Sequence, residues 1–184
     1  MAVPFISSVL RADPVRWHLL GRVYALNLPD CWIGAGFVRN AVWDHLHERS
    51  SSPLIGDVDV IWYNAQCTDA AQDRDIEGSL RALEPAVDWS VKNQARMHMR
   101  NGDAPYPSAV EAMRYWPETA TAVAARRSGP ESCEIAAPLR LDDLLNLILR
   151  PTSRFREEKR SIYEERIHSK AWLSTWPLLA TAEA

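Results

Sequence analysis

The feature that most constrains the fold is a pair of segments between residues 31 and 63. The apolar stretch Cys31-Trp32-Ile33 stops at Gly34, and "GAGFVRNAVW" then reads as a glycine turn followed by a helix. After a serine-rich loop, "GDVDVIWY" places Asp57 and Asp59 one residue apart at the start of an apolar run. Side chains at i and i+2 of a strand lie on the same face, about 7 Å apart along the backbone. We therefore expect strand, turn, helix and strand, with both carboxylates projecting from one face of a sheet.

The length and composition indicate an ordinary globular chain. Its 184 residues favour a single domain over 1–184, with a core over about 28–150 and a C-terminal helical part over about 151–184. A net charge of −3 gives no global sign of a nucleic-acid or membrane partner. The chain shows no leader-like N-terminus and no apolar run of the roughly 20 residues needed to span a bilayer, so we expect a cytoplasmic protein. Its three cysteines are widely spaced, which argues against a disulfide framework and structural zinc.

Charge is unevenly distributed along the chain. Between residues 57 and 84 there are seven acids and two arginines, whereas between 150 and 170 there are seven bases and four glutamates. An acidic patch followed by basic segments would suit a metal site that faces a polyanionic substrate. Solvated helix faces are the simpler explanation for these charges taken alone.

Hydrophobic periodicity alternates between helical and strand patterns. Helical spacing and capping residues predict helices over 15–26, 37–47, 68–83, 108–116, 117–128, 142–150 and 155–172. Period-two alternation and short apolar runs predict strands over 31–33, 57–63, 86–93 and 133–137. Strands alternate with helices without a regular parallel repeat, so we expect an α+β fold with a small mixed β-sheet packed with helices.

The acidic strand residues are candidates for a metal site. Two carboxylates as close as Asp57 and Asp59 are costly unless a cation neutralises them, and oxygen ligands of this kind are preferred by Mg²⁺. Asp88 follows the same logic, because it alternates with Val87 and Trp89 on a separate strand. Three carboxylates could hold two Mg²⁺ ions, with Mn²⁺ as a substitute. Taken singly, each acid is also explained as an exposed strand residue.

Phosphate-binding candidates surround the same segments. Gly34 and Gly36 at a helix start would allow close backbone approach, and a helix N-terminus favours an anion. Arg39 in the first helical turn could add a bidentate phosphate contact. Lys92 and Arg96, on and just after the second acidic strand, could neutralise charge on phosphates. A tight packing turn and a solvated surface lysine are the alternative explanations.

The order of glycine turn, helix and acid-x-acid strand resembles the signature of the polymerase-beta-type nucleotidyltransferase superfamily. "GFVRN" is most similar to the "GGxVRD" of its CCA-adding and poly(A) polymerase branch. Further segments, "WSVKNQARMH", "YWPETATAVAARR", "IAAPLRLDDLL" and "KAWLSTWP", resemble a family of small bacterial nucleotidyltransferase-like proteins, so that the similarity covers about 32–177. The resemblance implies that Asp57 and Asp59 are metal ligands and that Gly34 and Gly36 form the phosphate turn, with Asp88 as the candidate third acid.

The resemblance also implies an activity. We expect a Mg²⁺-dependent enzyme that transfers a nucleoside monophosphate from a nucleoside triphosphate to a hydroxyl acceptor. The chain is short for a catalytic domain with a large RNA-holding tail, which favours a small-molecule or protein acceptor over a polynucleotide. Two departures from the branch pattern, Ala35 within the glycine turn and Asn40 after the arginine, favour the alternative of a catalytically silent module that binds nucleotide or a protein partner. A metal-dependent phosphate hydrolase is a third, more distant possibility.

Overall fold

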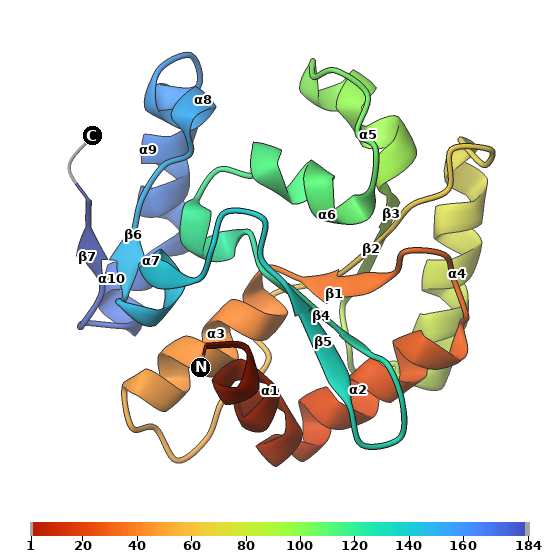
Figure 1. The fold of residues 1–184 in the computed structure, drawn as a ribbon, viewed down its shortest axis with the longest axis horizontal. Coiled ribbons are helices and arrows are strands. Elements are labelled where there is room, and N and C mark those ends of the chain that lie inside the picture. The colour runs from red at the N-terminus through yellow and green to blue at the C-terminus, as the bar shows by residue number, and fades with distance from the viewer. Residues whose placement is uncertain (1, 183–184) are drawn as a thin grey trace.

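A five-stranded mixed sheet lies at the centre of the molecule, with helices on both sides (Figure 1). The computed structural model describes residues 2–182. The strands follow the order β3-β2-β1-β4-β5 across the sheet. Their bounds are β1 Trp32–Gly34, β2 Val58–Trp62, β3 Trp89–Asn93, β4 Ala124–Arg127 and β5 Cys133–Ala136. In this sheet β2 and β3 run parallel, whereas the other neighbours are antiparallel.

The register of the strands sorts their side chains onto two faces. Val58 pairs with Trp89 and Val60 with Val91, and these apolar residues point into the larger core. The intervening residues point the other way, because side chains alternate along a strand. The second face therefore carries Asp59 on β2, in register with polar residues of β3.

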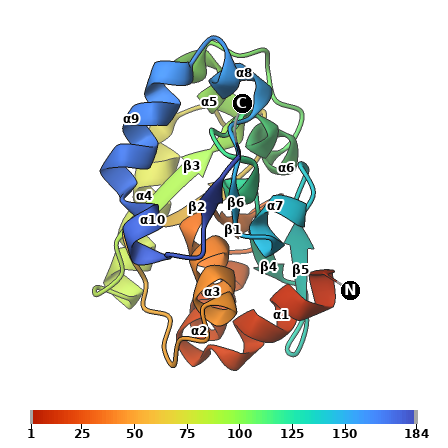
Figure 2. The ribbon, with the colours of Figure 1, turned by 90° about the vertical axis from the view of Figure 1, so that its left-hand side faces the viewer.

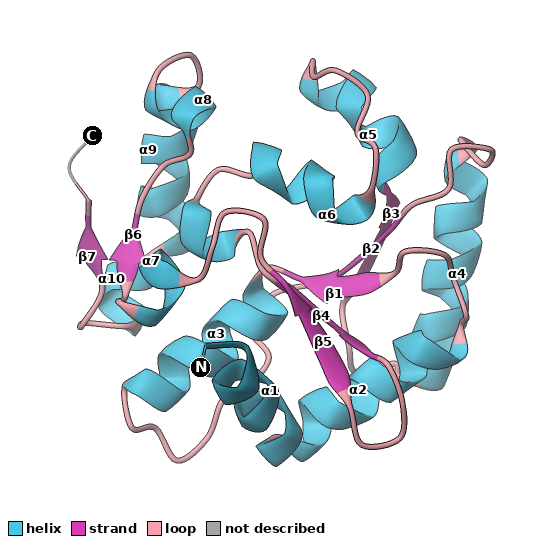
Figure 3. Ribbon diagram, viewed as in Figure 1, coloured by secondary structure: helices cyan, strands magenta, loops and turns pink. Residues whose placement is uncertain are grey.

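The first face is buried by the N-terminal half of the chain. Its helices are α1 Ala2–Ala12, α2 Pro14–Ala25, α3 Gly36–Leu46 and α4 Ala70–Leu83. The side chain of Asp13 caps α2 by accepting a hydrogen bond from the Arg16 amide at 3.0 Å, and Pro14 starts the helix. Figure 3 shows these helices below and beside the sheet.

The second face is covered by shorter segments. Helix α5 spans Gln94–Asn101, α6 spans Ala109–Ala112, and the 3₁₀ turns η1 and η2 span Met113–Tyr115 and Thr119–Thr121. The Ser108 hydroxyl caps α6 by accepting from the Glu111 amide at 3.0 Å. A small apolar cluster around Trp32 and Ile61 packs against α6 and η1. Because this cluster is small, the rest of the second face is left for a cleft.

The C-terminal part lies along one side of the molecule (Figure 2). It consists of α7 Asp142–Leu145, β6 Ile148–Leu149, α8 Ser153–Arg156, α9 Arg160–Lys170, α10 Trp172–Thr175 and β7 Ala180–Thr181. Strands β6 and β7 form a separate parallel pair. Trp172 and Trp176 pack edge-on against Trp43 of α3, which fixes this part to the core. Within residues 2–182, no helix is both long and apolar enough to cross a bilayer.

The predicted α+β fold with a small mixed sheet is confirmed, but several elements differ from expectation. The helix expected over 117–128 is wrong, because this segment forms only η2 and then strand β4. The helix expected over 142–150 ends after four residues and turns into β6. The helix expected over 155–172 is divided into α8, α9 and α10, and α1 and α5 were not predicted. Small residues such as Ala124 and Ala125 favour helix locally, but here both are buried in β4, Ala125 in the larger core and Ala124 in the smaller apolar cluster.

Candidate active site

Asp57 and Asp59 lie at the start of β2, on the face that opens toward α5 and α9. Asp57 is exposed and Asp59 is partly buried. Asp59 lines a cleft of about 230 Å³ together with residues from several distant parts of the chain. The cleft is lined by Ala35, Asp59, Ile61, Lys92, Gln94, Met97, Asn101, Trp116, Pro117, Thr121 and Arg166. Of the two acids, Asp59 lines the cleft, whereas Asp57 lies just before β2 and is exposed.

The electrostatics of Asp59 are unusual for an aspartate. Burial and the neighbouring charge of Asp57 raise its pKa from 3.8 to about 6. A hydrogen bond from Ser90 and the charges of Arg166 and Lys170 act in the opposite direction but do not cancel the increase. The two carboxylates therefore repel each other without full compensation by the protein, which is the condition that a bound cation would relieve.

Asp88 is not gathered with the other two acids. It is exposed and precedes β3, and its carbonyl oxygen accepts a hydrogen bond from the Val58 amide at 2.7 Å. Across the described residues, no three Asp, Glu, His or Cys side chains are close enough to share a metal. The residue in register with Asp59 on β3 is Ser90. The same register puts Asp88 beside Asp57, so the role of Asp88 as a third metal ligand stays a prediction.

The glycine turn joins β1 to α3 beside the acids. Ala35 has a φ of 53° and a ψ of −124°, a backbone conformation that an L side chain rarely adopts. Its amide donates a hydrogen bond to the Val123 carbonyl at 2.9 Å, so this N–H is not available to bind a phosphate. Gly36 begins α3, and amides in a first helical turn have no partner within the helix. A Cβ on Gly34 would lie 2.8 Å from Cη2 of Trp116, so glycine is needed there for packing.

Arg39 does not reach the cleft. Only 5% of the residue is exposed, and burial lowers its pKa to about 10 against the opposing charge of Glu118. Its guanidinium donates to Asn40 Oδ1 at 2.8 Å and to Thr121 Oγ1 at 3.2 Å. It also lies over the rings of Trp43 and Trp172, at 4.9 and 4.4 Å from the ring centroids. The structure thus places Arg39 beneath the turn, where it holds α3 against the C-terminal part.

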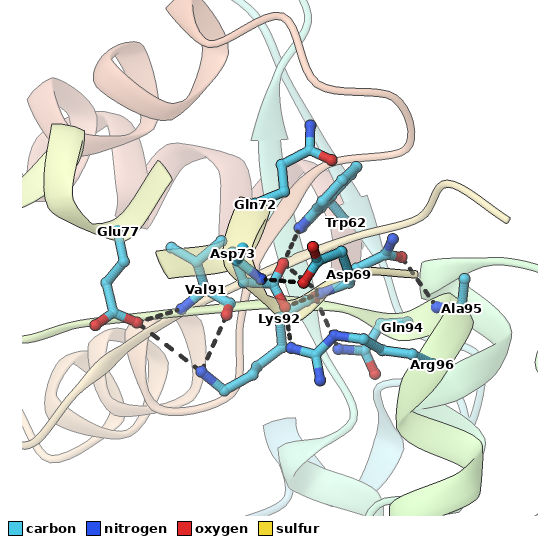
Figure 4. A network of polar contacts seen from close by, with 12 residues as sticks. Trp62, Asp69, Gln72, Asp73, Glu77, Val91, Lys92, Gln94, Ala95 and Arg96 are labelled. Atoms are coloured by element: carbon cyan, nitrogen blue, oxygen red, sulfur yellow. Dashed lines mark hydrogen bonds and ion pairs between the residues drawn. The ribbon is translucent and has the colours of Figure 1, made fainter. Parts of the chain in front are cut away.

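The side chains of Lys92 and Arg96 point in different directions, as Figure 4 shows. Lys92 lines the cleft, and its ammonium donates to the Val91 carbonyl at 3.0 Å, with Glu77 Oε2 at 3.9 Å. Arg96 instead forms an ion pair with Asp73, which is 2% exposed. Asp73 also accepts from the Trp62 indole at 2.8 Å. Of the three predicted phosphate-binding cations, only Lys92 lines the cleft together with Asp59.

The sequence interpretation missed two residues of the cleft, Trp116 and Arg166, and the register partner of Asp59, Ser90. Ser90 carries no motif signal, although its alternation with Trp89 places it on the polar face of its strand. Trp116 follows η1, and its proximity to Gly34 depends on tertiary packing alone. Arg166 lies in α9 among glutamates, where the spacing suggested only a salt-bridged surface helix. Its Nε lies 2.7 Å from Oε1 of Glu118, which is fully buried.

The donor set suits a divalent cation. Two neighbouring carboxylates provide hard oxygen ligands, and burial together with the charge of Asp57 raises the pKa of Asp59, which a bound cation would oppose. Two carboxylates leave most positions around Mg²⁺ for water and phosphate oxygens, which is the usual mode of Mg²⁺ binding with nucleotides. The residues present therefore fit Mg²⁺ bound through Asp57 and Asp59.

Comparisons with known proteins agree with this geometry. A family model described as nucleotidyltransferase matches residues 21–181. Among solved structures, an NMR structure described as revealing a CCA-adding enzyme head domain is 32% identical, with a TM-score of 0.85. That similarity covers 97% of this chain and 95% of the other chain. No match is found among curated proteins.

Proposed function

Because this chain belongs to the nucleotidyltransferase family, we propose that it transfers a nucleoside monophosphate from a nucleoside triphosphate to a hydroxyl acceptor in the presence of Mg²⁺. The observation that carries the proposal is Asp59 in the cleft with Asp57 two residues before it, because burial and the charge of Asp57 together raise the pKa of Asp59. A structural acid pair would be neutralised by protein cations. Here the pKa of Asp59 remains raised to about 6 in spite of the nearby basic residues.

The proposed reaction requires three tasks from the chain. Asp57 and Asp59 hold Mg²⁺, which when bound neutralises phosphate charge and stabilises the in-line displacement. The first-turn amides of α3 and the ammonium of Lys92 receive the remaining phosphate oxygens. The acceptor hydroxyl gives its proton to solvent as its oxygen forms a bond to the α-phosphorus, the bond from that phosphorus to the bridging oxygen breaks, and pyrophosphate leaves.

The acceptor is proposed to be a small molecule or a protein side chain. The cleft of about 230 Å³ is bordered by α5 on one side and α9 on the other. Both signs of charge occur on α9, with exposed pairs such as Arg160 and Glu164 at 2.7 Å, so α9 presents no continuous basic surface for a polynucleotide. The solved relative is described as a CCA-adding enzyme head domain, and a head domain alone leaves open which acceptor is used.

One observation favours the alternative of a module that binds nucleotide without turnover. Within residues 2–182, Asp57 and Asp59 have no third carboxylate beside them, and Ser90 stands next to Asp59 instead. Two carboxylates offer a pair of Mg²⁺ ions fewer ligands than the three expected from the sequence. A two-carboxylate site could therefore bind a nucleotide–Mg²⁺ complex and release it unchanged.

A labelling experiment separates these functions. The protein is incubated with each of the four α-labelled nucleoside triphosphates, Mg²⁺ or Mn²⁺, and a metabolite and protein extract. We expect label to appear in an acceptor, and we expect the double variant D57A/D59A to abolish it. Nucleotide binding by calorimetry without any transferred label would support the silent module. Absence of both binding and transfer would contradict the proposed function.

A further inference from the structure

We propose that Arg166 of α9 contacts the phosphates of the bound nucleotide, and that the buried Glu118 is the positioning residue that aims it. This inference rests on the proposed function and extends the site to the C-terminal part of the chain. Arg166 lies 107 residues after Asp59 in sequence, yet both line the same cleft.

The anchoring of Arg166 leaves part of its guanidinium free. Only Nε is used by the protein, in the 2.7 Å contact with Oε1 of Glu118. Among the described residues, neither Nη1 nor Nη2 of Arg166 has an acceptor, and 30% of the side chain is exposed. A guanidinium held by one edge presents its other donors in a fixed plane, which matches the geometry of phosphate oxygens.

Glu118 is itself held in place from several directions. It is fully buried, and its Oε2 accepts from the Thr121 hydroxyl at 2.8 Å. The same hydroxyl accepts from Arg39 Nη1 at 3.2 Å, which connects the anchor to α3. Glu118 also forms an isolated β-bridge with Pro151. The Glu118 carboxylate is therefore held in one position, and it fixes the position of the Arg166 side chain.

The plane of the Arg166 guanidinium is further restricted by Trp172. The guanidinium carbon of Arg166 lies 5.3 Å from the Trp172 ring centroid, and that of Arg39 lies 4.4 Å from the same centroid. Stacking on an aromatic ring favours a fixed orientation for a planar cation. This restriction lowers the entropy lost when a phosphate binds.

The charge balance of this cluster favours an anion in the cleft. The two guanidiniums of Arg39 and Arg166 lie near one buried carboxylate, that of Glu118, so these three groups alone sum to one positive charge. The carboxylates of Glu118 and Asp59 both raise the pKa of Arg39. The charge of Arg166 lowers the pKa of both Arg39 and Asp59, so these charges are near one another. Lys92, in contrast, is already close to Glu77. Arg166 is therefore the cation of this cleft with the most donors left for a polyphosphate.

The test measures equilibrium binding of each nucleoside triphosphate with Mg²⁺ by calorimetry, at two ionic strengths. The single variant R166K keeps the charge but removes the planar fork, and the double variant E118Q/R166Q removes both charges without leaving one buried alone. We expect roughly tenfold or greater loss of affinity in the double variant, a smaller loss in R166K, and a weaker salt dependence in the double variant. Thermal melts of each variant verify that it remains folded.

Arg160→Ala provides the matched control, because Arg160 lies on the same helix and pairs only with the exposed Glu164. Its affinity should equal that of the wild type. If the double variant binds as tightly as the wild type, the role of Arg166 is overturned while the proposed function stands. If the wild type itself binds none of the four triphosphates, both are overturned.

Discussion

Asp59 of β2 and Ser90 of β3 are register partners on two parallel strands, and both side chains project into the same side of the sheet. Adjacent strands lie about 4.8 Å apart, so Ser90 occupies the place from which a carboxylate could join Asp57 and Asp59. A hydrogen bond from Ser90 lowers the pKa of Asp59, although burial and Asp57 raise it more strongly. The site thus has a hydroxyl where a third metal ligand would fit.

This relationship predicts a gain of metal affinity in Ser90→Asp. A third carboxylate adds a hard oxygen ligand and a further negative charge, so Mn²⁺ or Mg²⁺ should bind roughly tenfold more tightly. Titration of the protein with Mn²⁺, followed by electron paramagnetic resonance, measures the affinity directly. Ser90→Ala is the control and should leave it within about twofold. Unchanged affinity in Ser90→Asp would show that the cation does not lie beside Asp59.

The raised pKa of Asp59 predicts a pH-dependent stability in metal-free protein. An acid whose pKa is about 6 when folded and 3.8 when unfolded holds its proton more tightly in the folded state. Stability should therefore increase as the pH falls from above 6 toward 4, and decrease as the pH rises. Asp59→Asn avoids the cost of ionising a carboxyl at this position in the folded protein, so it should be more stable than the wild type at pH 8 by about 1 to 3 kcal/mol.

Urea unfolding in EDTA at pH 8 and pH 5 measures this effect. The advantage of Asp59→Asn should shrink at pH 5, where the wild-type carboxyl is largely protonated. Asp75→Asn, on the exposed side of α4, should show no such dependence. If Asp59→Asn is no more stable than the wild type at pH 8, the protein already neutralises the charge of the Asp59 carboxylate.

Gly34→Ala should disturb the cleft through Trp116. The added Cβ would lie 2.8 Å from Cη2 of that indole, so the ring must move and the protein should lose about 1 to 3 kcal/mol. Tryptophan fluorescence and urea unfolding report the two effects. Gly78→Ala is the matched control, since a Cβ added there would meet no heavy atom within 4 Å, and it should stabilise α4 by up to about 1 kcal/mol. Equal stability of both variants would remove the packing explanation for Gly34.

Ala35→Gly should have the opposite effect on the same turn. The φ of 53° and ψ of −124° at Ala35 are sterically costly for alanine and accessible to glycine. Relief of about 1 to 3 kcal/mol of strain exceeds the entropic cost of glycine, which leaves a net gain of about 1 kcal/mol. A higher urea midpoint with an unchanged slope is the expected result. A lower midpoint would indicate that the turn is not strained at this residue.

The sequence predicts best where a local pattern determines the geometry. Period-two alternation correctly placed Asp57 and Asp59 at the start of a strand with Asp59 on its polar face, and the glycine turn and following helix were found where expected. The prediction fails where tertiary contacts determine the position of a side chain. Arg39 lies where the sequence pattern suggests a phosphate contact. Its guanidinium is instead buried, because it donates a hydrogen bond to Thr121 and lies over the ring of Trp172, both from distant segments. Arg166 could not be identified, since its partner Glu118 is 48 residues away.

The ion pair between Arg96 and Asp73 gives the sharpest test of this distinction. If Arg96 is structural, Arg96→Ala leaves the nearly buried Asp73 carboxylate without its cation, and unfolding should become easier by about 3 kcal/mol. Nucleotide affinity of the folded protein should stay within about twofold, because Arg96 does not line the cleft. Arg81→Ala, which removes an exposed pair with Glu77, is the control and should cost less than about 0.5 kcal/mol. A stable Arg96→Ala protein with weakened nucleotide binding would instead support the phosphate role expected from its sequence position.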